Sequence, residues 1–166
     1  FADGIRDRNT GIWRDVKIFT TGPVALRNAF VASQLPIPKL SPASESISVD
    51  VINATGESQT GTLRARIKEV EISLEKEISL QPGEAKTVQL SPGEFQALVM
   101  AQPRLWWPFN KGEQFRYHLT LEFCQRGSVS DRIETRFGIR DVRSNRDTPD
   151  RSRQFLVNGR RFFLHG

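Results

Sequence analysis

Polar and apolar residues alternate with a period of two in several separate stretches of the chain. The alternating stretches are 47–51, 63–68, 115–123 and 133–139. In the first of them, Ile47, Val49 and Val51 are separated by Ser48 and Asp50. Successive side chains of a β-strand point to opposite faces, so each stretch has one apolar face and one polar face. This pattern is typical of antiparallel sheets that cover a core on one side and face water on the other.

Residues that favour turns separate these stretches about every 8–12 positions. The candidate turns are Gly22-Pro23, 36–42, 53–61, Gln81-Pro82-Gly83, Ser91-Pro92-Gly93, 108–112, 126–130 and 144–149. Many short strands at this spacing predict an all-β protein, built as an antiparallel sandwich or barrel. We therefore expect no helix longer than about two turns. The expected core residues are Ile47, Val49, Val51, Leu63, Ile67, Leu119, Leu121, Phe137 and Ile139.

One stretch, 63–78, fits either a helix or two strands. Its apolar residues recur at helical spacing, and its many Glu and Lys residues favour a helix. Against a helix, the apolar residues from 72 to 80 occupy even-numbered positions, and Pro-Gly turns follow closely. We interpret the stretch as two strands with a change of phase near Lys68 and Glu69.

Near the C-terminal end, Asn158-Gly159 lies between the apolar runs 155–157 and 162–164. Asn-Gly between two apolar runs is the strongest short-range signal for a β-hairpin. The residues from Ser144 to Arg153 are polar and include one proline, which predicts a linker before the hairpin. Because an isolated hairpin is only marginally stable in water, we expect it to pair with a sheet edge or a second molecule.

The composition is that of an ordinary globular domain, with 37% hydrophobic and 26% charged residues in a chain of 166. A single cysteine, Cys124, excludes an internal disulfide and a metal site built from cysteines. No apolar run is long enough for a membrane-spanning helix. The net charge is +5, with basic ends and a mildly acidic middle. Near the C-terminus, arginines alternate with Asp147 and Asp150 instead of forming a basic stripe with aromatics, so we expect no nucleic-acid partner.

No arrangement of residues in the sequence predicts a catalytic site. The two histidines, His118 and His165, lie far apart, and there is no glycine-rich phosphate loop or nucleophile elbow. Glu75 and Glu77 would share one face of a strand, but a carboxylate pair cleaves glycosidic bonds only when it flanks a bound sugar. We therefore expect both glutamates to be surface residues, and we predict no catalytic residue, metal or cofactor.

Four motifs, in their order and spacing, resemble glycoside hydrolase family 2. They are residues 9–16 (NTGIWRDV), 103–108 (PRLWWP), 137–142 (FGIRDV) and 153–166 (RQFLVNGRRFFLHG). The likeness is to exo-β-D-glucosaminidases and to the β-mannosidase and endo-β-mannosidase branch, and it extends from about residue 5 to the end of the chain. In that family a sugar-binding jelly roll precedes an immunoglobulin-like sandwich, which precedes a (β/α)₈ barrel that holds the active site.

The resemblance implies a division of the chain into four parts. Residues 1–20 would be the last strand of a preceding jelly roll, and 21–143 an immunoglobulin-like antiparallel β-sandwich. Residues 144–152 would be a linker, and 153–166 the hairpin and first strand of the barrel. The intact enzyme would hydrolyse β-glucosaminides, β-mannosides or β-galactosides with retention, using two glutamates of the barrel. This chain alone would be inactive, its partners would be the flanking domains, and family habit suggests export, with any signal upstream of Phe1.

The resemblance also assigns roles to individual residues. Trp13, Trp106, Trp107 and Arg140 are expected at domain interfaces, although paired tryptophans are also suited to stack on sugar rings. His165 stands where the family usually has Arg or Lys before the glycine that ends the first barrel strand, so it would line the sugar subsite of the intact enzyme. The alternative function is a stand-alone carbohydrate-binding or adhesion sandwich without a catalytic partner.

Overall fold

The computed structural model describes residues 12, 14–109, 111–146 and 153–163. These residues form eleven strands and two short 3₁₀ helices, η1 (Lys68–Val70) and η2 (Gln96–Leu98). The strands are β1 (Val24–Gln34), β2 (Ala43–Asn53), β3 (Gln59–Ile67), β4 (Ile72–Leu80), β5 (Ala85–Leu90), β6 (Val99–Met100), β7 (Tyr117–Gln125), β8 (Ser128–Phe137), β9 (Val142–Asn145), β10 (Gln154–Val157) and β11 (Arg160–Phe162). The all-β prediction is confirmed. Within the described residues, no helix has the length and apolar character needed to cross a membrane.

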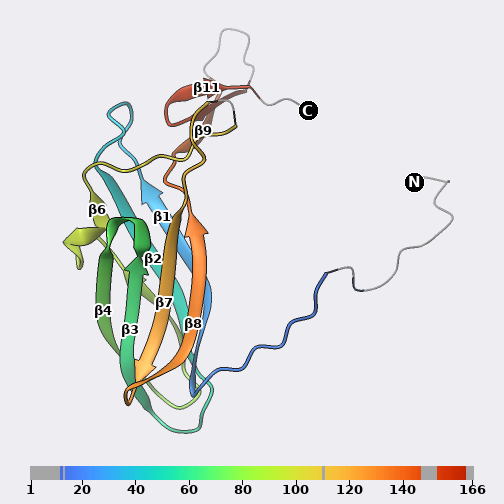
Figure 1. The fold of residues 1–166 in the computed structure, drawn as a ribbon, viewed down its shortest axis with the longest axis vertical. Helices are drawn as coiled ribbons and strands as arrows, with labels where there is room; N and C mark the ends of the chain where they lie inside the picture. The colour runs from blue at the N-terminus through green and yellow to red at the C-terminus, as the bar shows by residue number, and fades with distance from the viewer. Residues whose placement is uncertain (1–11, 13, 110, 147–152, 164–166) are drawn as a thin grey trace, which may run out of the picture.

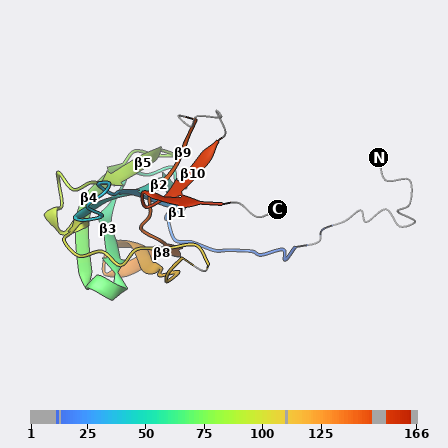
Figure 2. The ribbon, with the colours of Figure 1, turned by 90° about the horizontal axis from the view of Figure 1, so that it is seen from above.

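Two antiparallel sheets pack face to face (Figures 1 and 2). One has the order β1-β2-β5, with β6 also pairing with β2, and the other has the order β4-β3-β7-β8. In immunoglobulin lettering, β1, β2 and β5 correspond to A, B and E, and β3, β7 and β8 to C, F and G. The fold is therefore an immunoglobulin-like sandwich in which β4 lies beside β3.

The core lies between the inward faces of the two sheets. The predicted core residues are buried, with one exception. Phe137 is only half-buried, because it is the last residue of the edge strand β8 and packs at the margin of the core. Its ring stacks on that of Tyr117, with ring centroids 5.4 Å apart. Period-two alternation identified the inward face correctly but did not reveal that this strand end lies at an open edge.

The ambiguous stretch 63–78 consists of strands β3 and β4, which confirms the two-strand interpretation. The change of phase is the single turn η1, from Lys68 to Val70. It ends at Glu71, which has a left-handed backbone with φ of 51°. The two strands then pair antiparallel, from Ile67 opposite Ile72 to Gln59 opposite Leu80.

A small sheet of order β11-β10-β9 lies beyond one end of the sandwich (Figure 1). The hairpin predicted at Asn158-Gly159 is present, with φ of 50° and 74° at its two turn residues, as a type I′ turn requires. Strand β10 also pairs with β9 of the same chain. Ser144 and Asn145 belong to β9, although the linker was expected to begin at 144, and residues 147–152 lie outside the described residues.

The two ends of the described chain carry exposed apolar side chains. Residues 14–21 run away from the sandwich without forming a strand (Figure 1), and Ile18 and Phe19 are 91% and 76% exposed. At the other end, Phe155 and Phe162 face each other across the hairpin and are half-buried, whereas Phe163 is 75% exposed. Trp13 lies outside the described residues.

Candidate functional site

The structure brings Trp106, Trp107 and Arg140 together at the end of the sandwich that adjoins the small sheet. Backbone hydrogen bonds fix the loop that carries the tryptophans. The Trp106 N–H donates to the Ile139 carbonyl at 2.9 Å, and the Trp107 N–H donates to the Glu113 carbonyl at 2.8 Å. The first bond therefore attaches the loop to the segment that follows β8, and the second joins two residues within the loop itself.

Each tryptophan ring has an arginine near it. The guanidinium carbon of Arg140 is 4.8 Å from the Trp106 ring centroid, and that of Arg160 is 4.9 Å from the Trp107 ring centroid. These are cation–π distances. Arg160 belongs to β11, so its contact joins the small sheet to the tryptophan loop. Both rings are half-buried within the chain, and each has a face occupied by a guanidinium that a sugar ring would otherwise use.

Gly138 is needed for the Trp106 ring to lie where it does. A Cβ at Gly138 would be 2.8 Å from the Trp106 Cβ and 3.0 Å from its Cγ. Real Cβ atoms do not approach other carbons so closely, so a larger residue would displace the indole. The glycine of the 137–142 motif thus allows a tryptophan of the 103–108 motif to pack against it.

Asn158 connects three segments at this end. Its N–H donates to the Asp141 carbonyl at 2.8 Å, and its Oδ1 accepts from the Asp141 N–H at 2.9 Å. Its Nδ2 donates to the Trp106 carbonyl at 3.1 Å. The residue is only 3% exposed and has positive φ, which asparagine tolerates better than most residues. The hairpin turn is therefore bonded to the end of the sandwich and to the tryptophan loop.

Tyr117 supports the loop from inside the sandwich. It is buried at the start of β7, and its hydroxyl accepts a hydrogen bond from the Arg104 N–H at 2.8 Å. The Phe115 ring meets it edge to face, with centroids 4.8 Å apart, and the Arg104 guanidinium lies 3.6 Å from the Phe115 centroid. Burial raises the pKa of the Tyr117 hydroxyl, although the hydrogen bond from the Arg104 N–H opposes the shift. A tyrosine at this position of strand F, bonded to upstream backbone, resembles the tyrosine corner of immunoglobulin-like folds.

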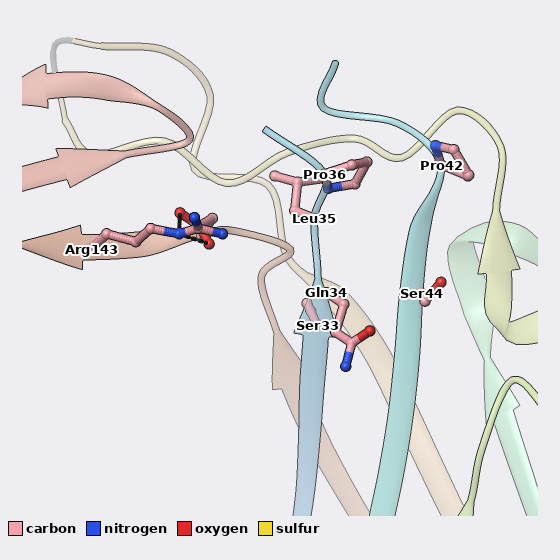
Figure 3. Close-up of a pocket in the computed structure, with 8 residues that line it drawn as sticks. Ser33, Gln34, Leu35, Pro36, Pro42, Ser44 and Arg143 are labelled. Atoms are coloured by element: carbon pink, nitrogen blue, oxygen red, sulfur yellow. Dashed lines mark hydrogen bonds and ion pairs between the residues drawn. The ribbon is translucent and has the colours of Figure 1, made fainter. Parts of the chain in front are cut away.

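A hollow of about 620 Å³ opens between this end of the sandwich and the small sheet (Figure 3). Its lining residues are Ser33, Gln34, Leu35, Pro36, Pro42, Ser44, Asp141 and Arg143. Asp141 provides the only carboxylate of this lining, and the Arg143 Nε lies 2.8 Å from it in an ion pair. A glycosidase needs two carboxyl groups on opposite sides of the scissile bond. This lining therefore does not form a glycosidic acid/base pair.

The acidic residues considered from the sequence are surface residues, as expected. Glu75 forms an ion pair with the Arg64 Nε at 2.8 Å, and Glu77 accepts a hydrogen bond from the Thr62 hydroxyl at 2.6 Å. Both glutamates are exposed on β4. His118 is bonded to Glu69 on the outer face of β7. Among the described residues, no three His, Cys, Asp or Glu side chains are grouped so as to hold a metal ion.

Sequence reasoning missed one buried acid, Glu45 of β2. It has no exposed surface, and its Oε2 accepts a hydrogen bond from the Ser33 hydroxyl at 2.6 Å. Its Oε1 has no hydrogen-bond partner within the described part of the chain. Burial raises the pKa of this carboxyl to about 7, although the Ser33 bond opposes the shift. The signal was present in the alternation, because Glu45 is in phase with Ala43 and Ile47 on the inward face.

Two of the residues predicted for sites, Trp13 and His165, lie outside the described residues. Neither the interface role of Trp13 nor the sugar-subsite role of His165 is tested by the structure. Trp106, Trp107 and Arg140 do lie together, and Asn158, which the sequence marked only as a turn residue, joins them to the hairpin.

Comparison with known proteins places this arrangement in context. The profile described as "Glycosyl hydrolases family 2" matches residues 29–140. An exo-β-D-glucosaminidase of Streptomyces avermitilis is 36% identical over 160 residues, which are 96% of this chain and 17% of that protein. A mannosylglycoprotein endo-β-mannosidase of Lilium longiflorum is 30% identical over a gapped alignment of 176 positions, which covers 98% of this chain and 17% of that protein. The crystal structure of an exo-chitosanase of Amycolatopsis orientalis superposes with a TM-score of 0.76 at 30% identity, over 88% of this chain and 16% of that one.

Proposed function

The chain belongs to glycosyl hydrolase family 2, and we propose that it works as the non-catalytic β-sandwich of a longer, retaining β-glycosidase. The observation that carries this proposal is the match along almost the whole chain to about one sixth of the length of exo-β-D-glucosaminidases. Hydrolysis of β-glucosaminides is the proposed activity of the intact protein, with β-mannosides and β-galactosides as the alternatives. Two carboxyl groups outside this chain would supply the acid and the nucleophile.

We propose that the sandwich holds its neighbouring domains in a defined orientation. Residues 1–20 would complete a jelly roll, 21–143 form the sandwich, 144–152 link it, and 153–166 begin a (β/α)₈ barrel. The bare apolar side chains of Ile18, Phe19 and Phe163 support this division, because each would gain about 1.5–3 kcal/mol on full burial. His165 would then line the sugar subsite at the end of the first barrel strand.

The interface role that we propose for Trp106, Trp107 and Arg140 is supported by what surrounds them. The hydrogen bonds of Asn158 connect the tryptophan loop directly to the hairpin that would lead into the barrel. A rigid connection at this point would transmit the orientation of the sandwich to the first barrel strand. Trp13 would pack within the jelly roll or at its border. The occupied faces of the two indoles favour this role over sugar stacking.

A panel of nitrophenyl β-glycosides, assayed with the intact protein that the gene encodes, tests the proposal. We expect the β-D-glucosaminide to give the highest kcat/KM. Fastest turnover of the β-mannoside or β-galactoside would correct the substrate. If no glycoside is turned over and the rest of the gene encodes no barrel, the chain is instead a binding or adhesion module and the proposal is wrong.

A further inference from the structure

A β-bulge in β1 turns a large aromatic side chain out of the core. The pairing of β1 with β2 shifts register between Arg27 and Phe30, and Asn28 in the bulge has φ of 54°. Before the bulge the even-numbered residues Val24 and Leu26 face the core, but after it the odd-numbered residues do. Phe30 is consequently 63% exposed, whereas an unbroken strand would place it inward. Bulges that redirect a side chain are frequent next to functional sites.

Phe30 lies in a hollow of about 250 Å³ between β1 and β8 (the β1–β8 hollow). Its lining residues are Ala29, Phe30, Val31, Arg116, Thr135, Arg136, Phe137, Gly138 and Arg140. Figure 1 shows β1 and β8 side by side along one edge of the sandwich. On the N-terminal side of the bulge, hydrogen bonds join β1 to β8: the Leu26 N–H donates to Asp131 Oδ2 at 2.8 Å, and the Val24 N–H donates to the Ser130 hydroxyl at 2.9 Å. The hollow opens on the C-terminal side of the bulge, beside residues 29–31.

The charge of the β1–β8 hollow comes only from arginines. Arg116, Arg136 and Arg140 line it, and no Asp or Glu does. Arg140 stacks on Trp106, but the guanidinium groups of Arg116 and Arg136 have no hydrogen bond or ion pair to any described residue. An exposed aromatic face beside unpaired guanidinium groups suits a ligand with one apolar face and one carboxylate, because a guanidinium binds a carboxylate through two parallel hydrogen bonds.

We propose that the β1–β8 hollow binds a carboxylated sugar, a hexuronate, with the C–H face of the ring on Phe30 and the carboxylate on Arg116 and Arg136. The hollow is smaller than the pockets of drug-sized ligands, which begin at about 300 Å³, and suits a single sugar ring. An added protein strand fits less well, because the bulge interrupts the regular edge that strand pairing requires. This binding is a property of the chain itself and does not depend on the proposed function.

A second hollow continues from the first. It is lined by Lys68, His118, Leu119, Thr120, Arg132, Glu134, Thr135 and Arg136, so the two hollows share Thr135 and Arg136. Of its basic residues, Arg132 is paired with Glu134 and Glu122, and His118 is bonded to Glu69. Lys68 and Arg136 have no such partner in the described part of the chain. A chain of uronates therefore has a second contact available, and we expect a trimer to bind more tightly than the monomer.

Titration of the ¹⁵N-labelled 166-residue chain with D-glucuronate and with tri-galacturonate tests the proposal, with D-glucose as the neutral probe. Amide shifts are expected to centre on residues 29–31 and 135–138. Phe30→Ala and Arg136→Gln should each weaken binding about tenfold, as loss of an aromatic platform or a charge-assisted bond does. Two matched controls away from the hollow, Val129→Ala on β8 and Arg126→Gln in the β7–β8 turn, should bind normally.

Several results would overturn the proposal. One is the absence of saturable shifts with both uronates, and another is equal shifts with glucose. Equal weakening by the control substitutions would show that charge or folding, and not this hollow, determines binding. Saturable binding of a hexaglutamate peptide with the same dependence on Phe30 would identify the hollow as a contact for an acidic protein surface instead of a sugar.

Discussion

The carboxyl group of Glu45 lies inside the sandwich, where water does not solvate its charge. Because burial raises its pKa to about 7, from 4.5, the folded chain binds a proton there that the unfolded chain has already lost. The contribution of Glu45 to the free energy of unfolding therefore falls as pH rises from about 4.5 to about 7, by about 3 kcal/mol in total, and is constant above that range.

Glu45→Gln should remove this pH dependence. The amide matches the shape of the protonated acid and carries no charge, so the variant should be more stable than the original chain above pH 7 and similar to it below pH 4.5. Urea unfolding between pH 4 and 8 measures the effect, and Glu57→Gln, an exposed position, is the control. Equal slopes for the Glu45→Gln variant and the original chain would show that Glu45 does not titrate in this range.

Asn158→Ala should free the hairpin without unfolding the sandwich. The substitution leaves the Asp141 N–H and the Trp106 carbonyl without their partner, and each lost bond costs about 1–3 kcal/mol when the group stays buried. Hydrogen exchange should become at least about tenfold faster at the amides of β10 and β11, with little change in β2 and β7. Asn158→Gly, which keeps the positive φ but also lacks both side-chain bonds, should have a similar effect. Uniform acceleration across all strands would contradict a local clamp.

At the scale of strands, the sequence pattern predicts most of the fold. Alternation locates β2, β3, β7 and β8, and the Asn-Gly turn locates the hairpin, because burial of one face leaves a period-two trace. The bulge of β1 left no such trace. Its phase change depends on the backbone of Asn28 and on pairing with β2, which a single strand does not encode. Strand β9 was not predicted either. Its four residues are all exposed and only Val142 is apolar, so there is no alternation of buried and exposed positions to mark it.

Packing between the motifs makes Gly138 a sensitive position. Gly138→Ala would place a methyl group 2.8 Å from the Trp106 Cβ, so the indole and its loop must move. We expect a loss of about 1–3 kcal/mol of stability, as in other overpacked sites, and a changed tryptophan emission spectrum. Gly56→Ala is the matched control, because nothing lies within 4 Å of a Cβ there. An unchanged spectrum and stability would show that the loop does not rest on the glycine.

At the scale of the whole molecule, the resemblance named Trp106, Trp107 and Arg140 as interface residues, and that role stays a prediction. The sequence did not predict that these three residues, which come from distant motifs, lie together in the chain itself. The arginine that covers Trp107 comes from the hairpin and was not anticipated. The exposed Phe30 and its arginines went unpredicted because residues 30, 116 and 136 meet only through the packing of β1 against β8.

The central claim is that this chain is the supporting part of a β-glycosidase and has no catalysis of its own. The most direct test compares turnover of nitrophenyl β-D-glucosaminide by the purified 166-residue chain and by the intact protein, at equal molar concentration. We predict release of nitrophenol by the intact protein and none above background by the chain. Turnover by the chain that survives repurification and is lost on Glu75→Gln or Glu77→Gln would contradict the account and place a catalytic pair on β4.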